Sequence, residues 1–302
     1  MADTYEIFTT SDTFVVPGSG DLTVFVELWG AGGGGAGGGG GSGNGATPGG
    51  GGGGASGACG QYVACMMPCV GGETLTVTVP AGGAAGNGGT GGNNAVGNDG
   101  TDGANASDTT VVGGSATITA KGGKALDSLG AATPRGKGGT TTAGGAAGSA
   151  GTNSLSPQGT IVNTGLIAVT GNITGGATSA GASNAAGGGG GRGGQPSTPF
   201  SVVVISTVNG AAASGTTGAI NTKSDYYSAR SIIGGALNSS GGNGGNGNGT
   251  NPGSSGLDTA ALVGWGGSGG GGGGGITSGG LAGDGANGRQ GGPALVIIYY
   301  TA

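Results

Sequence analysis

Apolar and polar residues alternate along several short runs of the chain. In the run ETLTVTV, Leu75, Val77 and Val79 would lie on one side of an extended backbone and the threonines between them on the other. Residues 21–29 follow a Pro-Gly turn signal and alternate in the same way. Alternation with a period of two is typical of strands that bury one face, so these runs predict β-strands.

The predicted strands gather in a few parts of the chain, and no stretch of a dozen residues carries the apolar stripe of an amphipathic helix. The strand-bearing parts are residues 5–29, 60–80, 109–120, 160–170, 201–208 and 294–301. The last of them contains ALVIIYY, which is almost continuously apolar and therefore predicts a central strand. Short strands joined by long glycine-rich loops predict an all-β fold with a β-sandwich or jelly-roll-like core.

Glycine dominates the segments between these strands, and it recurs there with a period of three. Of the 302 residues, 89 are glycine. The glycine-rich loops are residues 30–58, 81–105, 130–153, 175–195 and 234–292. Residues 83–94 read GAA GNG GTG GNN and residues 97–105 read GND GTD GAN. Shorter runs of this kind begin at Gly145, Gly187, Gly241 and Gly285.

A period of three is that of a polyproline II-type helix, which makes no internal hydrogen bonds. Where one edge of such a helix is glycine, neighbouring rods can approach to backbone hydrogen-bonding distance, because no Cβ holds them apart. We therefore expect the glycine-rich loops to pack as a polyglycine II helix bundle within a single domain that spans residues 1–302. Flexible coil is the competing interpretation, since glycine-rich segments normally lack order.

Composition and charge exclude several classes of function. Only 7% of the residues are charged, the net charge is -5, and histidine is absent. Eight lysines and arginines cannot form the basic stripe of a nucleic-acid-binding protein, and no apolar run approaches the roughly 18 residues of a membrane span. Without histidine, Ser-His-Asp and Cys-His catalytic arrangements are impossible. We expect a soluble protein without a Sec-type signal that is not an enzyme and needs no cofactor or metal.

The cysteines are interpreted as structural. Cys59, Cys65 and Cys69 would point to one side of an extended segment, together with Val63 and Met67. This arrangement predicts a buried row of reduced thiols. A disulfide would leave one cysteine over, and a zinc site would lack a fourth ligand.

Four carboxylates near strand ends are interpreted as solvated side chains rather than as an acid/base pair: Asp12, Asp21, Glu27 and Glu73. Asp99 and Asp102 lie in VGNDGTDG and would share one edge of a three-residue helix, about 9 Å apart and too distant to hold one calcium ion. We expect them to be solvated edge groups as well. The segment GAATPRGKGG lacks the spacing of a phosphate-binding loop.

Both ends of the chain resemble a known family. Residues 8–35 follow the form F-T-x-S-x-T-F-x-V-P, then L-T-V-x-V-x-x-W-G-A-G-G-G-G, and residues 283–300 end in GRQGGPALVIIYY. In these features the chain resembles the glycine-rich domain of bacteriophage tail and fibre proteins, over its whole length and most specifically at its ends. The resemblance implies polyglycine II helices at a fibre tip. Residues 160–235 depart from the family pattern because they are longer and less glycine-rich than it implies.

Aromatic residues in loop-like surroundings are the candidate contacts for a receptor or partner. Trp265 lies in LVGWGGSGG, and Tyr226 and Tyr227 lie in KSDYYSAR. Aromatic side chains on rigid loops can anchor a sugar or an outer-membrane protein, although each of these three could instead pack against the sandwich edge. Trp29 is interpreted as a core residue at the end of a strand.

The expected function is that of a non-enzymatic virion structural protein, assembled in the host cytoplasm. It would act as a phage tail-fibre or appendage adhesin that contacts a host surface glycan or outer-membrane protein. The alternative is a capsid decoration or fibre-assembly subunit with a purely structural role. Either role implies other virion proteins as partners and allows a homo-oligomer, without nucleic-acid binding or membrane insertion. An ice-binding protein is a third class, which the large β component disfavours.

Overall fold

The computed structural model describes two sheets and much of the glycine-rich sequence. The described residues are 4–43, 48–55, 57–58, 60–114, 116–125, 135–140, 166–170, 252, 263–264, 266–267, 269–276 and 280–301. The strands are β1 (Thr4–Phe8), β2 (Asp12–Val15), β3 (Asp21–Trp29), β4 (Tyr62–Val70), β5 (Thr74–Thr78), β6 (Thr109–Val112), β7 (Thr117–Ala120), β8 (Leu166–Thr170) and β9 (Leu295–Tyr300). These residues contain no helix, so the expected all-β class is confirmed for them.

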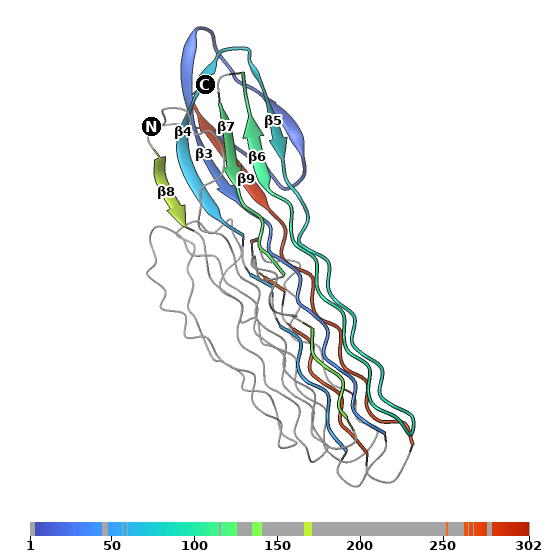
Figure 1. Ribbon diagram of the computed structural model, residues 1–302. Coiled ribbons are helices and arrows are strands. Elements are labelled where there is room, and N and C mark those ends of the chain that lie inside the picture. Colours follow the sequence, from blue (N-terminus) through green and yellow to red (C-terminus); the bar gives the residue numbers. More distant parts are fainter. Residues whose placement is uncertain are drawn as a thin grey trace.

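The strands form two antiparallel sheets (Figure 1). In the five-stranded sheet the order is β1-β9-β3-β4-β8, and in the four-stranded sheet it is β2-β5-β6-β7. The run ALVIIYY becomes β9 and lies between β1 and β3, as its apolar sequence predicts. The predicted strand at 201–208, and the part of 160–170 that precedes Leu166, lie outside the described residues.

The two sheets share one hydrophobic core, which gives this part of the chain a sandwich-like architecture. The five-stranded sheet contributes Val24, Val26 and Leu28 of β3, and the four-stranded sheet contributes Leu75 and Val77 of β5. All five side chains are buried, whereas the threonines of β5 lie on the other face. The alternation in both runs therefore matches the two faces of the sheets. Burial of each such aliphatic side chain contributes about 1.5–3 kcal/mol to the stability of the fold.

The outer face of the five-stranded sheet is also apolar where β3 and β9 meet. Leu295 and Ile297 are buried there with Trp29, and Phe25 and Tyr299 pack against this group with ring centroids 5.6 Å apart. Trp29 is the last residue of β3 and is 4% exposed. Its interpretation as a core residue at a strand end is confirmed.

Beyond the sheets, glycine-rich segments run side by side as undulating extended chains (Figure 1). Residues 30–43 continue directly from β3, lie at the centre, and are called the central segment. Six other segments surround it and are called the ring. As far as they are described, they are residues 48–60, 81–92, 95–108, 121–140, 264–276 and 282–294. The central segment and the ring together form the glycine-rich array.

The backbone N–H groups of the central segment donate in turn to three different neighbours. Three successive donors show the order: Gly37 to Thr101 O (2.9 Å), Gly38 to Ala286 O (3.0 Å) and Gly39 to Gly52 O (2.8 Å). The same order repeats at residues 34–36 and 40–42. Within each neighbour, the partner numbers fall as the central numbers rise, so these three neighbours run antiparallel to the central segment.

The carbonyl groups of the central segment accept hydrogen bonds from the other three neighbours, again in rotation. Successive acceptors are Gly38 O from Gly89 N (2.8 Å), Gly39 O from Gly273 N (2.9 Å) and Gly40 O from Gly139 N (2.8 Å). Within each of these neighbours, the residue numbers of the donors rise as the central numbers rise, so the three neighbours run parallel to the central segment. Hydrogen bonds also join adjacent ring segments, and they close the ring through the pairs Thr101–Asn87, Gly285–Gly89, Ala286–Gly271, Gly54–Gly270, Gly52–Lys137 and Gly100–Gly136.

The central segment has no room for side chains at several of its glycines. A Cβ on Gly37 would collide with the carbonyl group of Asn87, and a Cβ on Gly40 with the carbonyl group of Thr90. Both obstacles are backbone atoms of a hydrogen-bonded neighbour, which cannot rotate out of the way as a side chain can. The glycines are therefore required by the close approach of the segments.

Replacement of Gly37 by alanine should lower the free energy of unfolding by about 3 kcal/mol, because overpacking costs roughly 1–3 kcal/mol and separated segments lose hydrogen bonds of about 1 kcal/mol each. Denaturant unfolding followed by circular dichroism measures the change. Gly114→Ala is the control, since a Cβ at Gly114 would meet only the Glu73 carboxylate, at 3.3 Å. Equal unfolding midpoints for the two variants would contradict the close packing.

Candidate functional site

The end of the glycine-rich array that lies away from the sheets brings together turns from distant parts of the chain. Residues 92–97 connect two segments of the ring, and Gly280 and Leu281 precede a third. Asn94 N donates to Gly280 O (3.3 Å), and Gly280 N donates to Asn94 Oδ1 (3.1 Å). Asn93 forms an isolated β-bridge with Leu281. These contacts hold turns together that are almost 190 residues apart in the sequence.

The local sequence supports the conformation of these turns. Asn94 has a φ of 52° and Gly280 a φ of 129°, in the left-handed region that asparagine and glycine adopt most readily. Two apolar side chains are exposed at the same end, Val96 at 53% and Leu281 at 55%. We call Asn93, Asn94, Val96, Gly280 and Leu281 the tip surface. Its exposed apolar and amide groups, held by hydrogen-bonded turns, are suited to contact another molecule.

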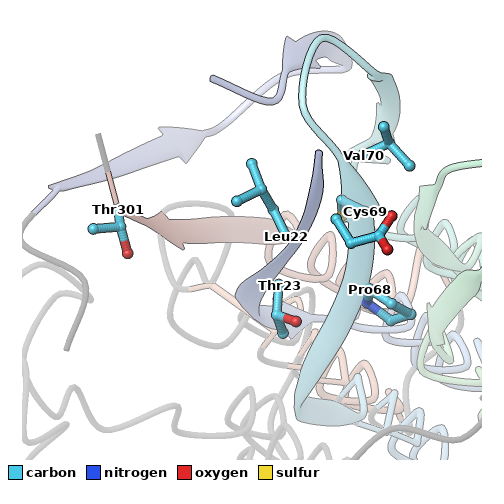
Figure 2. Close-up of a pocket in the computed structure, with 7 residues that line it drawn as sticks. Leu22, Thr23, Pro68, Cys69, Val70 and Thr301 are labelled. Carbon is cyan, nitrogen blue, oxygen red and sulfur yellow. The ribbon is translucent and has the colours of Figure 1, made fainter. Parts of the chain in front are cut away.

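A pocket of about 550 Å³ lies at the opposite end of the molecule, where β3 begins and β4 ends (Figure 2). It is lined by Asp21, Leu22, Thr23, Pro68, Cys69, Val70 and Thr301. Asp21 is the only carboxylate and Cys69 the only thiol among these lining residues. In the described part of the chain, no three histidine, cysteine or acidic side chains lie close enough together to hold a metal ion.

The two described thiols of β4 are buried. Cys65 and Cys69 face the shared core with Val63 and Met67, and both are free thiols. Burial raises the pKa of each thiol to about 11, and the negative charge of Glu73 adds to the effect at Cys69. The predicted row of buried, reduced thiols is confirmed for these two, whereas Cys59 lies outside the described residues.

The carboxylates of Glu27 and Glu73 both accept hydrogen bonds within the fold. The expectation of a solvated side chain is wrong for Glu27, which is buried, whereas Glu73 is partly exposed. Glu27 is 6% exposed, and its Oε2 accepts a hydrogen bond from Tyr299 Oη (2.7 Å). Glu73 accepts hydrogen bonds from the backbone N–H groups of Val70 (2.9 Å) and Gly114. The partners of Glu27 and of Glu73 come in part from other strands and loops, which the position of a residue near a strand end does not reveal.

Asp99 and Asp102 lie on one edge of segment 95–108, as expected, but they are ion-paired rather than simply solvated. Lys137 Nζ is 2.8 Å from Asp99 Oδ2, and Arg135 Nη1 is 3.2 Å from Asp102 Oδ2. Both basic residues belong to GAATPRGKGG, so this segment neutralises the carboxylates of its neighbour in the ring. The pairing was not predictable because the two segments are far apart in the sequence.

Two opposing influences act on the pKa of Asp99. Partial burial raises it, whereas hydrogen bonds from Lys137 Nζ and Gly138 N, together with the charges of Lys137 and Arg135, lower it. The second group of effects prevails, and the pKa lies below the ordinary value for aspartate. The ionised form of Asp99 is therefore favoured in the folded protein.

The predicted receptor or partner contacts, Trp265, Tyr226 and Tyr227, lie outside the described residues. The residues of the tip surface are not among the predicted contacts. The sequence signal for the tip surface is a pair of extra residues, 95 and 96, which interrupts the glycine triplets of 83–94 and 97–105. In the structure this interruption coincides with the turn that ends one segment and begins the next.

The folded-state pKa of Asp99 is depressed, so its carboxylate stabilises the fold above the ordinary aspartate pKa, and this contribution is lost as the pH falls through the folded-state pKa. We expect wild-type stability to fall below about pH 4 and to fall less in Asp99→Asn. Urea unfolding at pH 7 and between about pH 4 and pH 2 measures this. Asp12→Asn, at an exposed strand position, is the control. Identical pH dependence in the wild type and Asp99→Asn would refute the stabilising role.

A raised pKa and burial should also make Cys65 and Cys69 slow to react with a thiol reagent. With a pKa of about 11 instead of the usual 9.0, each thiol has roughly a hundredfold less thiolate at pH 8. Ellman's reagent applied to a Cys59→Ser variant isolates these two residues. We expect labelling of the folded protein to be at least roughly tenfold slower than labelling in urea. Equally fast labelling in both states would show that the row is accessible.

No helix in the described part of the chain has the length and apolarity needed to cross a bilayer. No protein-family model matches the chain, and no curated protein matches it either. A functional conclusion therefore depends on the geometry of this chain itself, with the tip surface at one end and the pocket beside Asp21 at the other.

Proposed function

We propose that the glycine-rich array is a bundle of polyglycine II-type helices. The rotation of hydrogen-bond partners every three residues supports this proposal, because it matches a helix with three residues per turn. The ring of six neighbours around residues 30–43 also supports it, since each edge of such a helix can face a separate rod. Hydrogen bonds between rods, about 1 kcal/mol each, then stabilise segments that have few apolar side chains to bury.

We further propose that the chain is a non-enzymatic virion structural protein, namely a phage tail-fibre or appendage adhesin that contacts the host surface. The observation that carries this proposal is that the two ends of the molecule differ. Thr4 and Thr301 lie beside the end of the sheets that faces away from the array, and the tip surface lies at the far end of the array. An adhesin requires this division, with attachment at one end and recognition at the other.

The array is suited to be the shaft between the two ends. A polyglycine II-type rod of the length of residues 30–43 would extend about 40 Å. Because each rod is hydrogen-bonded to its neighbours along this length, the turns at its end are presented on a stiff support. The resemblance of residues 8–35 and 283–300 to phage tail and fibre proteins agrees with this role.

The chemistry of the tip surface indicates the kind of receptor. None of its five residues is charged, so an uncharged partner fits it best. The exposed amide of Asn93 can bond to sugar hydroxyl groups or to backbone groups, and Val96 and Leu281 offer apolar contacts. We propose a host surface glycan or a loop of an outer-membrane protein as the receptor.

A capsid decoration or fibre-assembly subunit is the second candidate, with other virion proteins or further copies of the chain as its partners. It is favoured by apolar side chains exposed on the sheets, which a lattice contact could cover: Tyr5, Val15, Met66, Val70 and Val112. In that role the sheets would form the principal contact, and the tip surface would have no receptor.

Binding of the purified, fluorescently labelled chain to envelope fractions from a panel of bacteria tests the proposal. We expect saturable binding to at least one envelope, weakened about tenfold or more by Val96→Ser/Leu281→Ser, since burial of two such side chains typically contributes more than 1.4 kcal/mol. Val15→Ser/Val112→Ser is the matched control, because it removes two exposed valines from the sheets.

The reverse pattern, with binding lost only in the control variant, would place recognition on the sheets and contradict the role of the tip. Absence of binding by well-folded wild-type protein across the panel would favour the decoration or fibre-assembly role.

A further inference from the structure

The segments of the ring differ in their exposure. Segments 48–60 and 264–276 are buried along almost all of their described length and consist almost entirely of glycine and alanine there. Segments 81–92 and 95–108 bury about every third residue and expose most of the others. The array therefore has an open side, formed by these two segments and the adjoining edges of their neighbours.

On the open side, aspartate and asparagine side chains accept hydrogen bonds from backbone N–H groups of an adjacent segment. Four such acceptors recur at every third residue: Asp108 Oδ1 accepts from Gly122 N (3.0 Å), Asn105 Oδ1 from Ala125 N (2.8 Å), Asp102 Oδ1 from Arg135 N (3.2 Å) and Asp99 Oδ1 from Gly138 N (2.9 Å). The spacing is that of the backbone hydrogen bonds inside the array. The side chains thus continue the pattern of the array at its surface.

A second row of acceptors joins segments 282–294 and 81–92. Its members are Asn287 Oδ1, which accepts from Gly88 N (2.8 Å), and Asp284 Oδ1, which accepts from Gly91 N (2.7 Å). These residues are again three positions apart. We call Asp99, Asp102, Asn105, Asp108, Asp284 and Asn287 the Asx ladder.

Each side chain of the Asx ladder stands in for a missing backbone carbonyl. Inside the array, Gly89 N donates to the backbone oxygen of Gly38 (2.8 Å), whereas Gly88, the preceding residue, donates to the side chain of Asn287. Without the side chain, the N–H of Gly88 would be left without this acceptor. A row of such N–H groups beside glycine would be a template for another glycine-rich segment, as the open edge of a β-sheet is for another strand.

We infer that the Asx ladder closes the open side of the array against a glycine-rich segment from a second copy of this chain. Its oxygens use the N–H groups that an added segment would need. Three of its carboxylates also pair with partly exposed cations of segment 121–140, Asp99 with Lys137, Asp102 with Arg135 and Asp108 with Lys121. Charged side chains at an edge are a recognised means of preventing edge-to-edge association.

This inference concerns the lateral surface of the array and does not depend on the adhesin role of the tip surface. Sedimentation velocity over a series of protein concentrations tests it. The variant Asp284→Ala/Asn287→Ala leaves Gly88 and Gly91 without their side-chain acceptors. We expect it to associate at protein concentrations at least tenfold lower than the wild type does.

Two controls isolate the effect of the acceptors. Asn98→Ala removes an exposed amide that donates to Thr90 Oγ1 (2.6 Å), so no backbone N–H loses a side-chain acceptor. Asp284→Asn/Asn287→Asp exchanges the side chains but keeps an acceptor oxygen at each position. Both variants should sediment like the wild type at every concentration.

A folded Asp284→Ala/Asn287→Ala variant that sediments like the wild type at every concentration would overturn the inference. If that variant does not fold, Asn105→Ala takes its place in the same measurement, because it removes the side-chain acceptor of Ala125 N alone. Sedimentation like that of the wild type would again overturn the inference. Hydrogen exchange in the wild type gives a separate check, because capped Gly88 and Gly91 should exchange as slowly as Gly86 and Gly89. Fast exchange at Gly88 and Gly91 would show that the side chains do not hold these N–H groups.

Discussion

The structure depends on one constraint, which is that the backbone groups of the central segment find their hydrogen-bond partners on other segments. An extended chain with three residues per turn cannot satisfy them itself, and unpaired N–H and C=O groups in its buried interior would be costly. Partners on all sides require close approach, and close approach requires glycine at positions such as Gly37 and Gly40. The high glycine content of this chain therefore reflects packing as much as flexibility.

The sheets supply what the glycine-rich segments lack, namely an apolar core that sets the register of the array. β3 leads into the central segment, and β9 begins where segment 282–294 ends, so the antiparallel pairing of these two strands is continued by the hydrogen bonds below them. At this junction, Thr109 Oγ1 donates to Trp29 O (3.1 Å) inside the protein. A small side-chain core can thus align a much longer backbone-bonded shaft.

The sequence predicts those features that have a local period. Strand faces follow from alternation, as at Leu75 and Val77, and the triplets of 83–94 and 97–105 mark segments on the open side, where polar residues can occupy the positions between the glycines. Segment 48–60, whose described residues are all buried, is mostly glycine, so its sequence does not mark which positions repeat every three residues. The hydrogen bond of Glu27 and the tip surface escaped prediction because each joins parts of the chain that only long-range packing brings together.

The enclosure of the central segment also determines when the protein can complete its fold. Residues 30–43 donate hydrogen bonds to Gly283, Ala286 and Arg289, which are synthesised long after them. Until then, one side of the central segment has no partner, and its unpaired backbone can bind other chains. The central segment is therefore fully enclosed only after segment 282–294 has been synthesised, and the nascent chain before that point is the form most exposed to misassembly.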